Sequence, residues 1–522
     1  MFKVIEQKLA DINKAGLSAR LADRQIGLER EALRVNQRGS ISQTAHPKGL
    51  GSPLVHPAIT TDYSEALLEF ITPPLGSIEE VMNCLGDIQG FVYTQLQDEL
   101  LWAASMPCVI TGDKGIPIAT YGQSNPGMMK TIYRRGLAHR YGRVMQVIAG
   151  VHYNYSMNDS FWAEYQALLG NQRSLKDFKS EQYFALIRNL LRMGWMVSYL
   201  FGASPAVCKS FLQGAKTDLE IYDETTFYGR YATSLRMGDI GYQNNKENEI
   251  GIKACYYNLD AYICSLEGAI HTPSPEYEKI GVLVDGEYRQ LNANILQIEN
   301  EYYSTVRPKQ PLQGNERPSV ALNKRGVEYI ELRSLDLNIL SPLGVDREQL
   351  LFLDLLMLCC LLNESPGISV QEQREIDSNA MRVAHMGRKK DLVLQRHNRD
   401  ILLQDWAQDI CQALEPIAVQ LDALEGRTDY METLNVQKDK VADTSKTPSA
   451  KILEDMRVHE KGFFVYMREK SELYKNMMTS KQLPAERMAQ FVKQAEESIR
   501  RQKTIEQEDY LTFEEYLQLY YA

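Results

Sequence analysis

The sequence predicts an α+β fold built on an antiparallel sheet, and three observations support that prediction. First, extended segments are dispersed among helical segments along residues 1–345. Second, their spacing is irregular and lacks the repeated strand–helix–strand unit that is typical of a parallel sheet. Third, the chain becomes mainly helical from Asp346 onward. The predicted strands cover residues 26–36, 66–72, 145–156, 291–303 and 327–335.

The helices and loops between these strands follow from local signals. Ser77 followed by Glu80 is a capping-box pattern, which predicts the start of a helix. The run from Leu350 to Leu362 is apolar apart from Asp354, which predicts a buried helix. Segments rich in Gly and Pro are predicted to be loops. The expected helices cover residues 3–24, 77–100, 128–141, 181–201 and 350–362, and the expected loops cover 39–57 and 108–125.

The chain divides into two predicted regions. Residues 1–345 form a sheet-containing core, and residues 346–522 form a mainly helical region that we expect to pack on that core. Within the second region, residues 436–450 combine Lys, Asp, Ser, Thr and Pro, which predicts a mobile linker or loop. Pro484 predicts the first turn of a last long helix, running to Arg501.

Composition and charge narrow the class of protein. The 522 residues are 44% hydrophobic and 24% charged, with a net charge of -10, which is ordinary for a globular protein and unsuited to general nucleic-acid binding. The first residues lack the apolar run of a signal peptide, and the run at 350–362 is too short to span a bilayer. We therefore expect a cytoplasmic protein without a nucleic-acid or membrane partner.

The eight cysteines are scattered and show neither a CxxC pair nor the spacing of a zinc site. In a cytoplasmic chain, free and often buried thiols are the simplest expectation, and a redox disulfide is the alternative. They stand at Cys84, Cys108, Cys208, Cys255, Cys264, Cys359, Cys360 and Cys411.

Strand parity places ionisable side chains on shared faces. Because side chains alternate along a strand, Glu29 and Glu31 share one face of residues 26–36, opposite Arg30 and Arg34. The same alternation places residues of the other four predicted strands on shared faces. These sets are Gln146, Ile148, Gly150, His152 and Asn154; Glu299 and Glu301; Glu331 and Arg333; and Leu67, Glu69 and Ile71, with Asp62 just before the last of these strands. If these faces converge, they form a concave floor dense in carboxylates, with a few arginines and one histidine.

Carboxylates crowded into a cleft cannot all stay charged without a compensating cation. Oxygen ligands of this kind favour Mg²⁺ or Mn²⁺. The alternative is that each segment is an independent amphipathic strand facing water, which explains one such segment better than five. His152 stays open at this point as a metal ligand, a base or a satisfied core residue, and the sequence pattern alone favours the core residue.

Metal ions combined with arginines indicate phosphoryl transfer, because metals bridge phosphate oxygens while arginines hold the transferring group. The chain has no GxxxxGK[ST] loop, no convincing dinucleotide fingerprint and no GxSxG elbow. Nucleotide binding would therefore use a sheet-and-metal site instead of a phosphate-binding loop.

Eight ordered sequence blocks are the most specific feature of the chain. They read GLEREALRVN, TTDYSEALLEFITP, YRRGLAHRYG, QVIAGVHYNYS, YLFGASPAVC, YATSLRMGDIGY, LQIENEYYSTVRPK and VEYIELRSLDLN. Over residues 20–345 the chain thereby resembles the bacterial (proteobacterial-type) glutamate–cysteine ligases, or γ-glutamylcysteine synthetases. The resemblance implies a glutamine-synthetase-like bowl of antiparallel strands surrounded by helices. It also implies ATP-dependent joining of the L-glutamate γ-carboxylate to the L-cysteine amine through γ-glutamyl phosphate, the first step of glutathione synthesis.

The resemblance further implies roles for individual residues, with ATP as co-substrate and two or three Mg²⁺ ions, or Mn²⁺ in their place. The implied metal ligands are Glu29, Glu31, Asp62, Glu69, His152 and Glu331. Arg134 and Arg333 would stabilise the transferring phosphoryl group, and Arg236 would hold an amino-acid carboxylate. Gln146 and Ile148 would line the glutamate site. The cysteine pocket would be walled by Tyr133, Leu137, Tyr242 and Tyr303.

One residue departs from the family pattern: Tyr63 stands where phenylalanine is expected, and it adds a hydroxyl near the pocket.

The resemblance favours a monomer. Since the chain ends at Ala522 without an ATP-grasp domain, we do not expect it to catalyse the second step of glutathione synthesis. The alternatives are a related ligase with another amine acceptor, or a non-catalytic binding protein on the same fold, which the intact set of ligand positions disfavours.

Overall fold

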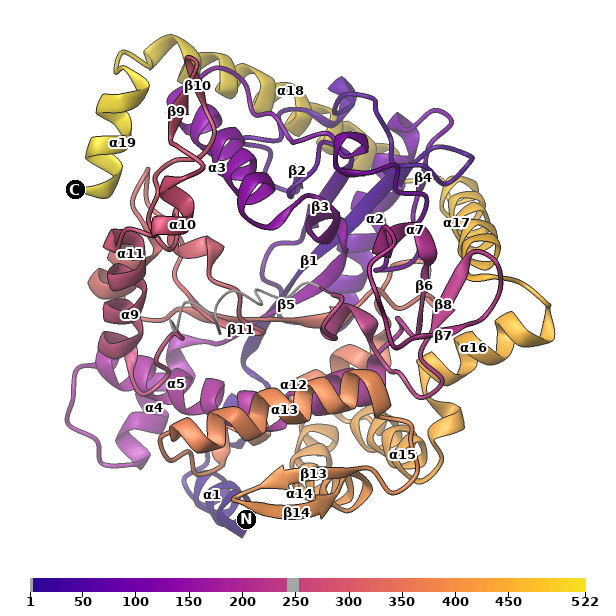
Figure 1. Ribbon diagram of the computed structural model, residues 1–522. Coiled ribbons are helices and arrows are strands. Elements are labelled where there is room, and N and C mark those ends of the chain that lie inside the picture. The colour runs from indigo at the N-terminus through magenta and orange to yellow at the C-terminus, as the bar shows by residue number, and fades with distance from the viewer. Residues whose placement is uncertain (1–2, 242–252) are drawn as a thin grey trace.

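A seven-stranded antiparallel sheet lies at the centre of the molecule (Figure 1). The computed structural model describes residues 3–241 and 253–522. Across the sheet the strands follow the order β11-β12-β5-β1-β3-β2, and β4 pairs with the end of β1. The strands are β1 Arg24–Val35, β2 Ile59–Thr61, β3 Leu67–Ile71, β4 Leu100–Leu101, β5 Gly150–Met157, β11 Val306–Lys309 and β12 Tyr329–Asp336.

The alternation in the long strands separates a packing face from an open face. On β5, Val151, Tyr153 and Tyr155 are fully buried, and the alternate residues His152 and Asn154 point to the opposite face. This confirms the parity predicted for the second half of residues 145–156. Helices α2, α5 and α6 contact the sheet, and α12 packs on α2 and α5. Their bounds are α2 Ile78–Gln95, α5 Leu175–Met193, α6 Trp195–Phe201 and α12 Arg347–Leu362.

The open face of the sheet is surrounded by α3 (Asn125–Tyr141), α9 (Leu259–His271) and α11 (Pro318–Arg325), as Figure 1 shows. Smaller elements connect these layers. They are α1 Lys3–Lys14, α4 Asp159–Leu168, α7 Lys209–Leu212, α10 Pro275–Glu278, β6 Ala206–Cys208, β7 Glu220–Ile221, β8 Thr226–Tyr228, β9 Leu283–Val284 and β10 Glu287–Tyr288.

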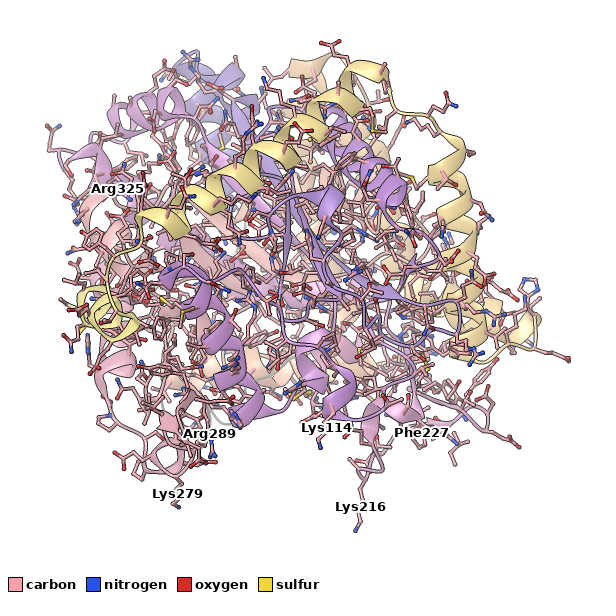
Figure 2. All side chains as sticks on the ribbon, turned by 90° about the horizontal axis from the view of Figure 1, so that it is seen from above. Lys114, Lys216, Phe227, Lys279, Arg289 and Arg325 are labelled. Atoms are coloured by element: carbon pink, nitrogen blue, oxygen red, sulfur yellow. A yellow bond between two sulfur atoms is a disulfide. The ribbon has the colours of Figure 1, made fainter. Side chains whose placement is uncertain are left out.

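The region from residue 346 onward is mainly helical, as predicted. Figure 2 looks onto the side of the molecule that α18 crosses, with Lys216 and Lys279 projecting from the edge. The elements of this region are α13 Val370–Met386, β13 Val393–Arg396, β14 Arg399–Leu402, α14 Leu403–Glu425, α15 Asp429–Ala442, α16 Pro448–Val458, α17 Phe463–Ser480, α18 Ala485–Glu508 and α19 Phe513–Tyr521.

The mobile linker predicted over residues 436–450 is wrong, because the structure places the end of α15 and the start of α16 there. Gln437 and Val441 of α15 are buried, so this helix has a packed face. The Thr447 side chain accepts a hydrogen bond from the backbone N–H of Ala450, and Pro448 occupies the first turn of α16. The Ser, Thr and Pro that suggested a linker therefore belong to a helix cap.

The strand predicted over residues 291–303 is also wrong. The segment is irregular: it contains an isolated bridge between Asn294 and Pro273 and a 3₁₀ turn at Glu299–Glu301. The carboxylate of Glu301 accepts hydrogen bonds from the backbone N–H of Gln297 and from Arg140, at 2.7 and 2.9 Å. Side chains in this segment satisfy polar groups that a strand would pair with a neighbouring strand. Glu299 and Glu301 therefore do not join the face that carries the other predicted carboxylates.

Several predicted boundaries are shifted by turns. The helix expected over residues 3–24 ends at Lys14, and a 3₁₀ turn follows at Ser18–Ala22. The helix expected over residues 181–201 is two helices that meet at Gly194. The strand expected from Met145 begins at Gly150, after a 3₁₀ turn at Val144–Val147. Ser77 caps α2 by accepting a hydrogen bond from the backbone N–H of Glu80, without the reciprocal bond of a full capping box.

The expectation that all cysteines are free is wrong for one pair. Cys108 and Cys208 form a disulfide, with their Cα atoms 5.4 Å apart, although 100 residues separate them in sequence. The fold brings β6 beside the loop that carries Cys108, which no spacing rule in the sequence reveals. The other six cysteines are free thiols. Among the described helices, none has the length and hydropathy needed to cross a lipid bilayer.

Candidate active site

A cavity of about 400 Å³ opens over the open face of the sheet. We call it the open-face cavity; β1, β3, β5, β11 and β12 contribute to its floor, and α3, α19 and the loop 310–317 contribute to its walls. The size lies in the range of ligand-binding pockets. Ten residues predicted for the site line it: Glu29, Asp62, Glu69, Tyr133, Arg134, Leu137, Gln146, His152, Glu331 and Arg333.

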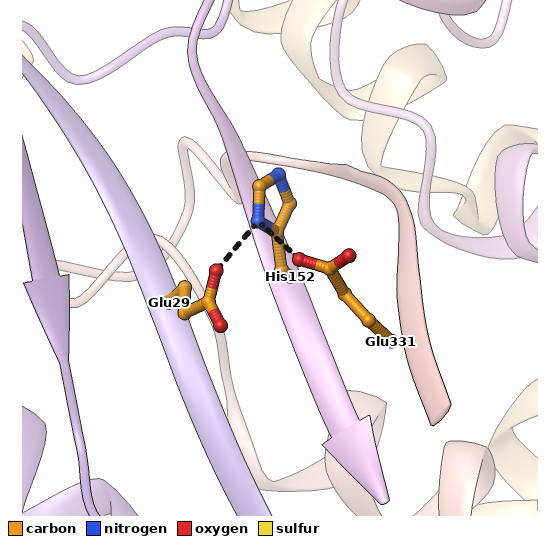
Figure 3. A group of neighbouring side chains, drawn as sticks. All are labelled: Glu29, His152 and Glu331. Atoms are coloured by element: carbon orange, nitrogen blue, oxygen red, sulfur yellow. Dashed lines mark hydrogen bonds and ion pairs between the residues drawn. The ribbon is translucent and has the colours of Figure 1, made fainter. Parts of the chain in front are cut away.

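Three of these residues from three adjacent strands form a compact cluster (Figure 3). Glu29 of β1 lies opposite His152 of β5 in the antiparallel register. The His152 Nδ1 atom is 3.1 Å from Glu29 Oε2 and 3.4 Å from Glu331 Oε1. Each residue offers one ligand atom, and these atoms all lie within 4.8 Å of one another. The Glu29–His152–Glu331 cluster is therefore a candidate metal centre with oxygen and nitrogen donors.

A β-bulge positions Arg333 beside this cluster. Leu332 pairs with Tyr153 and Leu335 pairs with Val151, so two residues of β12 oppose the single residue His152 of β5. Arg333 Nη1 donates a hydrogen bond to Glu331 Oε1 at 3.0 Å and lies 3.5 Å from His152 Nδ1. Arg333 thus lies in the bulge, and its guanidinium group meets the carboxylate of Glu331, two residues away on the same strand, beside His152.

A second group of carboxylates adjoins the cluster on β1 and β3. Glu31 and Glu69 are paired across the two strands. Glu31 Oε2 accepts a hydrogen bond from the backbone N–H of Gly150 at 2.6 Å, and Glu31 Oε1 lies 3.6 Å from His152 Nε2. Asp62 and Glu69 both line the open-face cavity. Glu31 does not line the open-face cavity, but its carboxylate lies next to His152, which does.

The crowding perturbs the acid–base behaviour of these groups. Burial, followed by the charges of Glu29 and Asp62, raises the pKa of Glu69 well above its ordinary value. Burial also raises the pKa of Glu31. In contrast, the pKa of Glu331 is well below its ordinary value, because Lys309 and Arg333 outweigh the effect of burial. Burial therefore disfavours the charged forms of Glu31 and Glu69, whereas the cations beside Glu331 favour its charged form.

The neighbouring carboxylates also shift the pKa of His152. Burial and the nearby Arg333 both lower its pKa, but the hydrogen bonds to Glu29 and Glu331 outweigh them and raise the pKa to about 9. The two carboxylates thus favour a positive charge between them. A divalent cation bound by the same oxygens would supply that charge and leave the imidazole neutral, which is the form that binds metals.

Helix α3 contributes one wall through residues on successive turns. Tyr133 and Leu137 are four residues apart, so they lie on one face of the helix. The Arg134 guanidinium donates a hydrogen bond to the backbone carbonyl of Asp62 and stacks over the Tyr121 ring at 4.6 Å. Arg134 and Arg333 therefore reach the cavity from different elements, one above the sheet and one on its floor.

The remaining predicted residues lie beside the open-face cavity or outside the described part of the chain. Ile148 and Arg236 are buried, and Arg236 Nη2 donates to the backbone carbonyl of Arg333 at 2.9 Å. A Cβ at Gly150 would lie 2.1 Å from that Nη2, so only glycine allows this approach. The Tyr303 hydroxyl lies 3.9 Å from Met237 Sδ, next to Arg236. Tyr242 lies outside the described residues.

The site contains further polar residues to which the sequence pattern assigns no role. Asn154 Nδ2 donates a hydrogen bond to Glu29 Oε1 at 2.8 Å, and Lys309 Nζ lies 3.3 Å from Glu331 Oε2. Lys130 and Arg307 also line the cavity, and burial, followed by Arg134, lowers the pKa of Lys130 to about 8. Arg307 and Lys309 alternate on β11, so strand parity would have revealed them if residues 306–309 had been recognised as a strand.

Comparison with known proteins identifies the family. The family model for glutamate-cysteine ligase matches residues 9–383. The chain belongs to the glutamate-cysteine ligase family. Glutamate–cysteine ligase of Alcanivorax borkumensis is 45% identical over 524 residues, covering 99% of both chains. That of Pseudomonas aeruginosa is 43% identical over 522 residues, covering 100% of this chain and 98% of the relative.

Solved structures extend this family assignment. The crystal structure of glutamate–cysteine ligase from Francisella tularensis in complex with AMP has a TM-score of 0.89 at 35% identity, covering 96% of this chain and 97% of that one. A bifunctional glutathione synthetase from Pasteurella multocida has a TM-score of 0.70 at 22% identity. The match covers 90% of this chain and 54% of that one, and the two share the fold. The expected glutamate–cysteine ligase fold, with its antiparallel sheet and helical C-terminal region, is confirmed.

Proposed function

We propose that the open-face cavity joins the γ-carboxylate of L-glutamate to the amine of L-cysteine at the expense of ATP, giving γ-glutamylcysteine, ADP and phosphate. The observation that carries this proposal is the Glu29–His152–Glu331 cluster with Arg333 beside it. Its donor set and adjacent cations suit phosphoryl transfer. Membership of the glutamate-cysteine ligase family over residues 9–383 supports the same reaction, which is the first step of glutathione synthesis.

The chemistry requires two steps, because a carboxylate oxygen is a poor leaving group and phosphate is a good one. A γ-carboxylate oxygen of glutamate first attacks the terminal phosphorus of ATP, and the bond to ADP breaks. The cysteine amine then attacks the acyl carbon of γ-glutamyl phosphate, phosphate leaves, and the nitrogen loses a proton. The cavity must therefore hold an anionic substrate beside a triphosphate without prohibitive repulsion.

Divalent cations would offset that repulsion when bound, and Mg²⁺ or Mn²⁺ suits the donors present. We assign Glu29, Glu31, Asp62, Glu69, His152 and Glu331 as the residues that would hold two or three ions. Burial and the charges of Glu29 and Asp62 raise the pKa of Glu69, and the hydrogen bonds to Glu29 and Glu331 raise the pKa of His152; both shifts support this assignment, because a bound cation would stabilise the charged carboxylates.

The chain's own cations would hold the reacting groups. Arg134 and Arg333 would contact the transferring phosphoryl group from the wall and from the floor of the cavity. Arg236 would bind an amino-acid carboxylate, with Gln146 and Ile148 lining the glutamate site. We assign Tyr133, Leu137, Tyr242 and Tyr303 to the pocket that would hold the cysteine side chain. We also propose that the protein acts as a monomer, as the family resemblance implies.

The decisive experiment measures ADP release from the purified protein with Mg-ATP and L-glutamate, with and without L-cysteine, followed by mass analysis of the product. The expected result is cysteine-dependent ADP release and the mass of γ-glutamylcysteine. Release that depends on a different amine would shift the acceptor and keep the mechanism. Absence of ADP release from folded protein would overturn the proposal and favour a binding protein on this fold.

A further inference from the structure

The segment that carries Arg236 lies against the end of α13, a helix of the C-terminal region. Residues 230–239 include a 3₁₀ turn at Leu235–Met237 and an isolated bridge between Ser234 and Ser204. A segment of this kind has no long ladder of its own, so its backbone groups must find partners on neighbouring elements. The position of Arg236 therefore depends on what holds the two ends of this segment.

Backbone hydrogen bonds to α13 hold the first end. The carbonyl groups in the last turn of a helix are free to accept from donors outside it. The backbone N–H groups of Thr233 and Ser234 donate to the carbonyl of Ala384, at 2.9 and 3.2 Å. Thr233 Oγ1 donates to the carbonyl of Val383 at 2.9 Å. The segment thus caps the C-terminus of α13.

Arg388 extends this contact just beyond the helix. Its side chain donates to the backbone carbonyls of Arg230 and Ala232, at 2.7 and 3.2 Å. Residues 230–234 are therefore fixed by several bonds that join backbone groups to α13 and to the residue after it.

A side-chain pair holds the second end of the segment. His385 Nε2 of α13 lies 2.8 Å from Asp239 Oδ1. A Cβ at Gly238 would lie 2.7 Å from the same nitrogen, so only glycine allows this approach. The side chains of His385 and Asp239 are 27% and 64% exposed, and exposed pairs contribute little to the stability of a fold. The effect of this pair is therefore expected in the position of the segment.

Arg236 lies between these two fixed ends. The hydroxyl of Ser234 donates to Asp336 Oδ1 of β12 at 2.8 Å, and Arg236 Nη1 lies 3.8 Å from the same oxygen. Together with its bond to the backbone carbonyl of Arg333, this contact places the Arg236 guanidinium against β12. A shift of the 3₁₀ turn would therefore move the guanidinium relative to the floor of the open-face cavity.

We propose that His385 is a positioning residue for amino-acid binding, which acts through Asp239 to hold the 3₁₀ turn where Arg236 meets the substrate carboxylate. This inference rests on the proposed function, since it takes Arg236 to bind an amino-acid carboxylate. Neither His385 nor Asp239 is among the described residues that line the open-face cavity. The match to the family model ends at residue 383, two positions before His385.

The variants His385→Ala and Asp239→Ala test this role by steady-state kinetics. Each should raise the KM for the amino acid whose carboxylate Arg236 binds by roughly fivefold to tenfold, because a displaced group loses its alignment with the substrate. The kcat and the KM for ATP should change by less than about twofold, as for a loss of uniform binding. His385→Gln should restore the wild-type KM, because its amide nitrogen can donate to Asp239. Arg382→Ala is the matched control, since Arg382 is exposed on the same helix.

A double variant separates positioning from a general structural effect. If His385 acts through Asp239, combining His385→Ala with Asp239→Ala should impair the enzyme no more than either change alone, because both remove one contact. Multiplied effects would show independent roles and overturn the inference. An unchanged KM for both amino acids in the single variants would overturn it too, as would an equal rise in all three KM values with a lower melting temperature.

Direct binding keeps this test separate from the reaction. Isothermal titration compares the binding of L-glutamate and of L-cysteine to wild type and to His385→Ala. Wild-type protein that binds an amino acid but forms no γ-glutamylcysteine would contradict the proposed function, and weaker binding to His385→Ala would still support the positioning role. Equal binding to the two proteins would overturn the inference. Wild-type protein that shows neither binding nor turnover would overturn both proposals.

Discussion

At the scale of single residues, the site is defined by carboxylates that the fold forces together. Glu31 and Glu69 face each other on adjacent strands, and Glu29 and Glu331 flank His152. Burying several like charges is unfavourable unless cations compensate them. The protein supplies Arg333 and Lys309 for Glu331, but it leaves Glu69 with a raised pKa. A site arranged in this way is preorganised for ligands that bring positive charge.

Replacement of Glu331 by glutamine tests this arrangement. Glu331→Gln keeps the shape of the side chain and removes its charge. We expect ADP release to fall by at least about a hundredfold, because loss of a metal ligand should cost more than loss of a residue that only positions a ligand. Circular dichroism should show an unchanged fold. The control is Glu328→Gln, because Glu328 pairs with Lys179 at the surface, at 2.7 Å. Equal activity of Glu331→Gln and wild type would remove Glu331 from the metal site.

A second prediction concerns acid stability and His46. Both ring nitrogens of His46 are buried without a hydrogen-bond partner among the described residues, and burial lowers its pKa to about 3. The unfolded state, with a pKa near 6.5, therefore takes up the proton first. Stability from this histidine is fully present above pH 6.5 and is lost as the pH falls toward 3, by up to about 1.4 kcal/mol per pH unit.

The measurement is the urea unfolding free energy between pH 4.5 and 7. His46→Gln should show a smaller loss of stability than wild type as the pH falls through this range. Part of the slope should remain, because burial also lowers the pKa of His56, to about 4. Identical slopes for wild type and His46→Gln would contradict the assignment.

At the scale of elements, α3 is held in place by a buried ion pair. Arg140 Nη1 lies 2.9 Å from Glu301 Oε1, and both side chains are fully buried. The Arg140 guanidinium also lies over the Tyr277 ring at 4.1 Å. The segment that replaces the predicted strand 291–303 therefore has a definite role, because it fixes the end of the helix that carries Tyr133, Arg134 and Leu137.

Arg140→Met should destabilise the protein by about 3–5 kcal/mol, because it leaves the Glu301 carboxylate buried without its cation. Urea unfolding measures this change in free energy. Arg135→Met is the matched control, since Arg135 is exposed on the same helix, and it should change stability by less than about 0.5 kcal/mol. A similar small effect for Arg140→Met would show that the pair contributes little.

At the scale of the whole molecule, the C-terminal third is tied to the sheet by buried polar contacts. Arg24 of β1 lies 2.6 Å from Asp354 Oδ2 of α12, and the Tyr430 hydroxyl of α15 donates to the same oxygen at 2.8 Å. α17 also packs on α2. These contacts support the proposal that residues 346–522 pack on the core of residues 1–345 and unfold together with it.

Arg24→Met tests this coupling. The substitution leaves the fully buried Asp354 carboxylate without this cation, and it should lower the free energy of unfolding by about 3–5 kcal/mol. Calorimetry and loss of activity should report the same single transition at a lower temperature. Arg20→Met is the control, because Arg20 pairs with a partly exposed Glu164 and should cost less than about 1 kcal/mol. Two separate transitions in wild type would show that the C-terminal region folds independently.

The sequence by itself determined the features that depend on neighbouring residues. The alternation in β1 and β5, the buried helix α12 and the Ser77 cap of α2 all rest on side chains two to four positions apart. The eight ordered blocks led to the family, which the comparisons confirm. The metal and substrate roles of individual residues stay predictions, and Glu331→Gln tests one of the metal ligands.

Only the tertiary structure decided which distant segments meet. The disulfide between Cys108 and Cys208, the Arg140–Glu301 pair and the Asp239–His385 pair join residues that are 100 or more positions apart. The residues of 291–303 satisfy their polar groups through such contacts instead of a strand ladder. Local patterns record propensity and burial, whereas these pairings depend on how complete layers pack, which no short stretch of sequence contains.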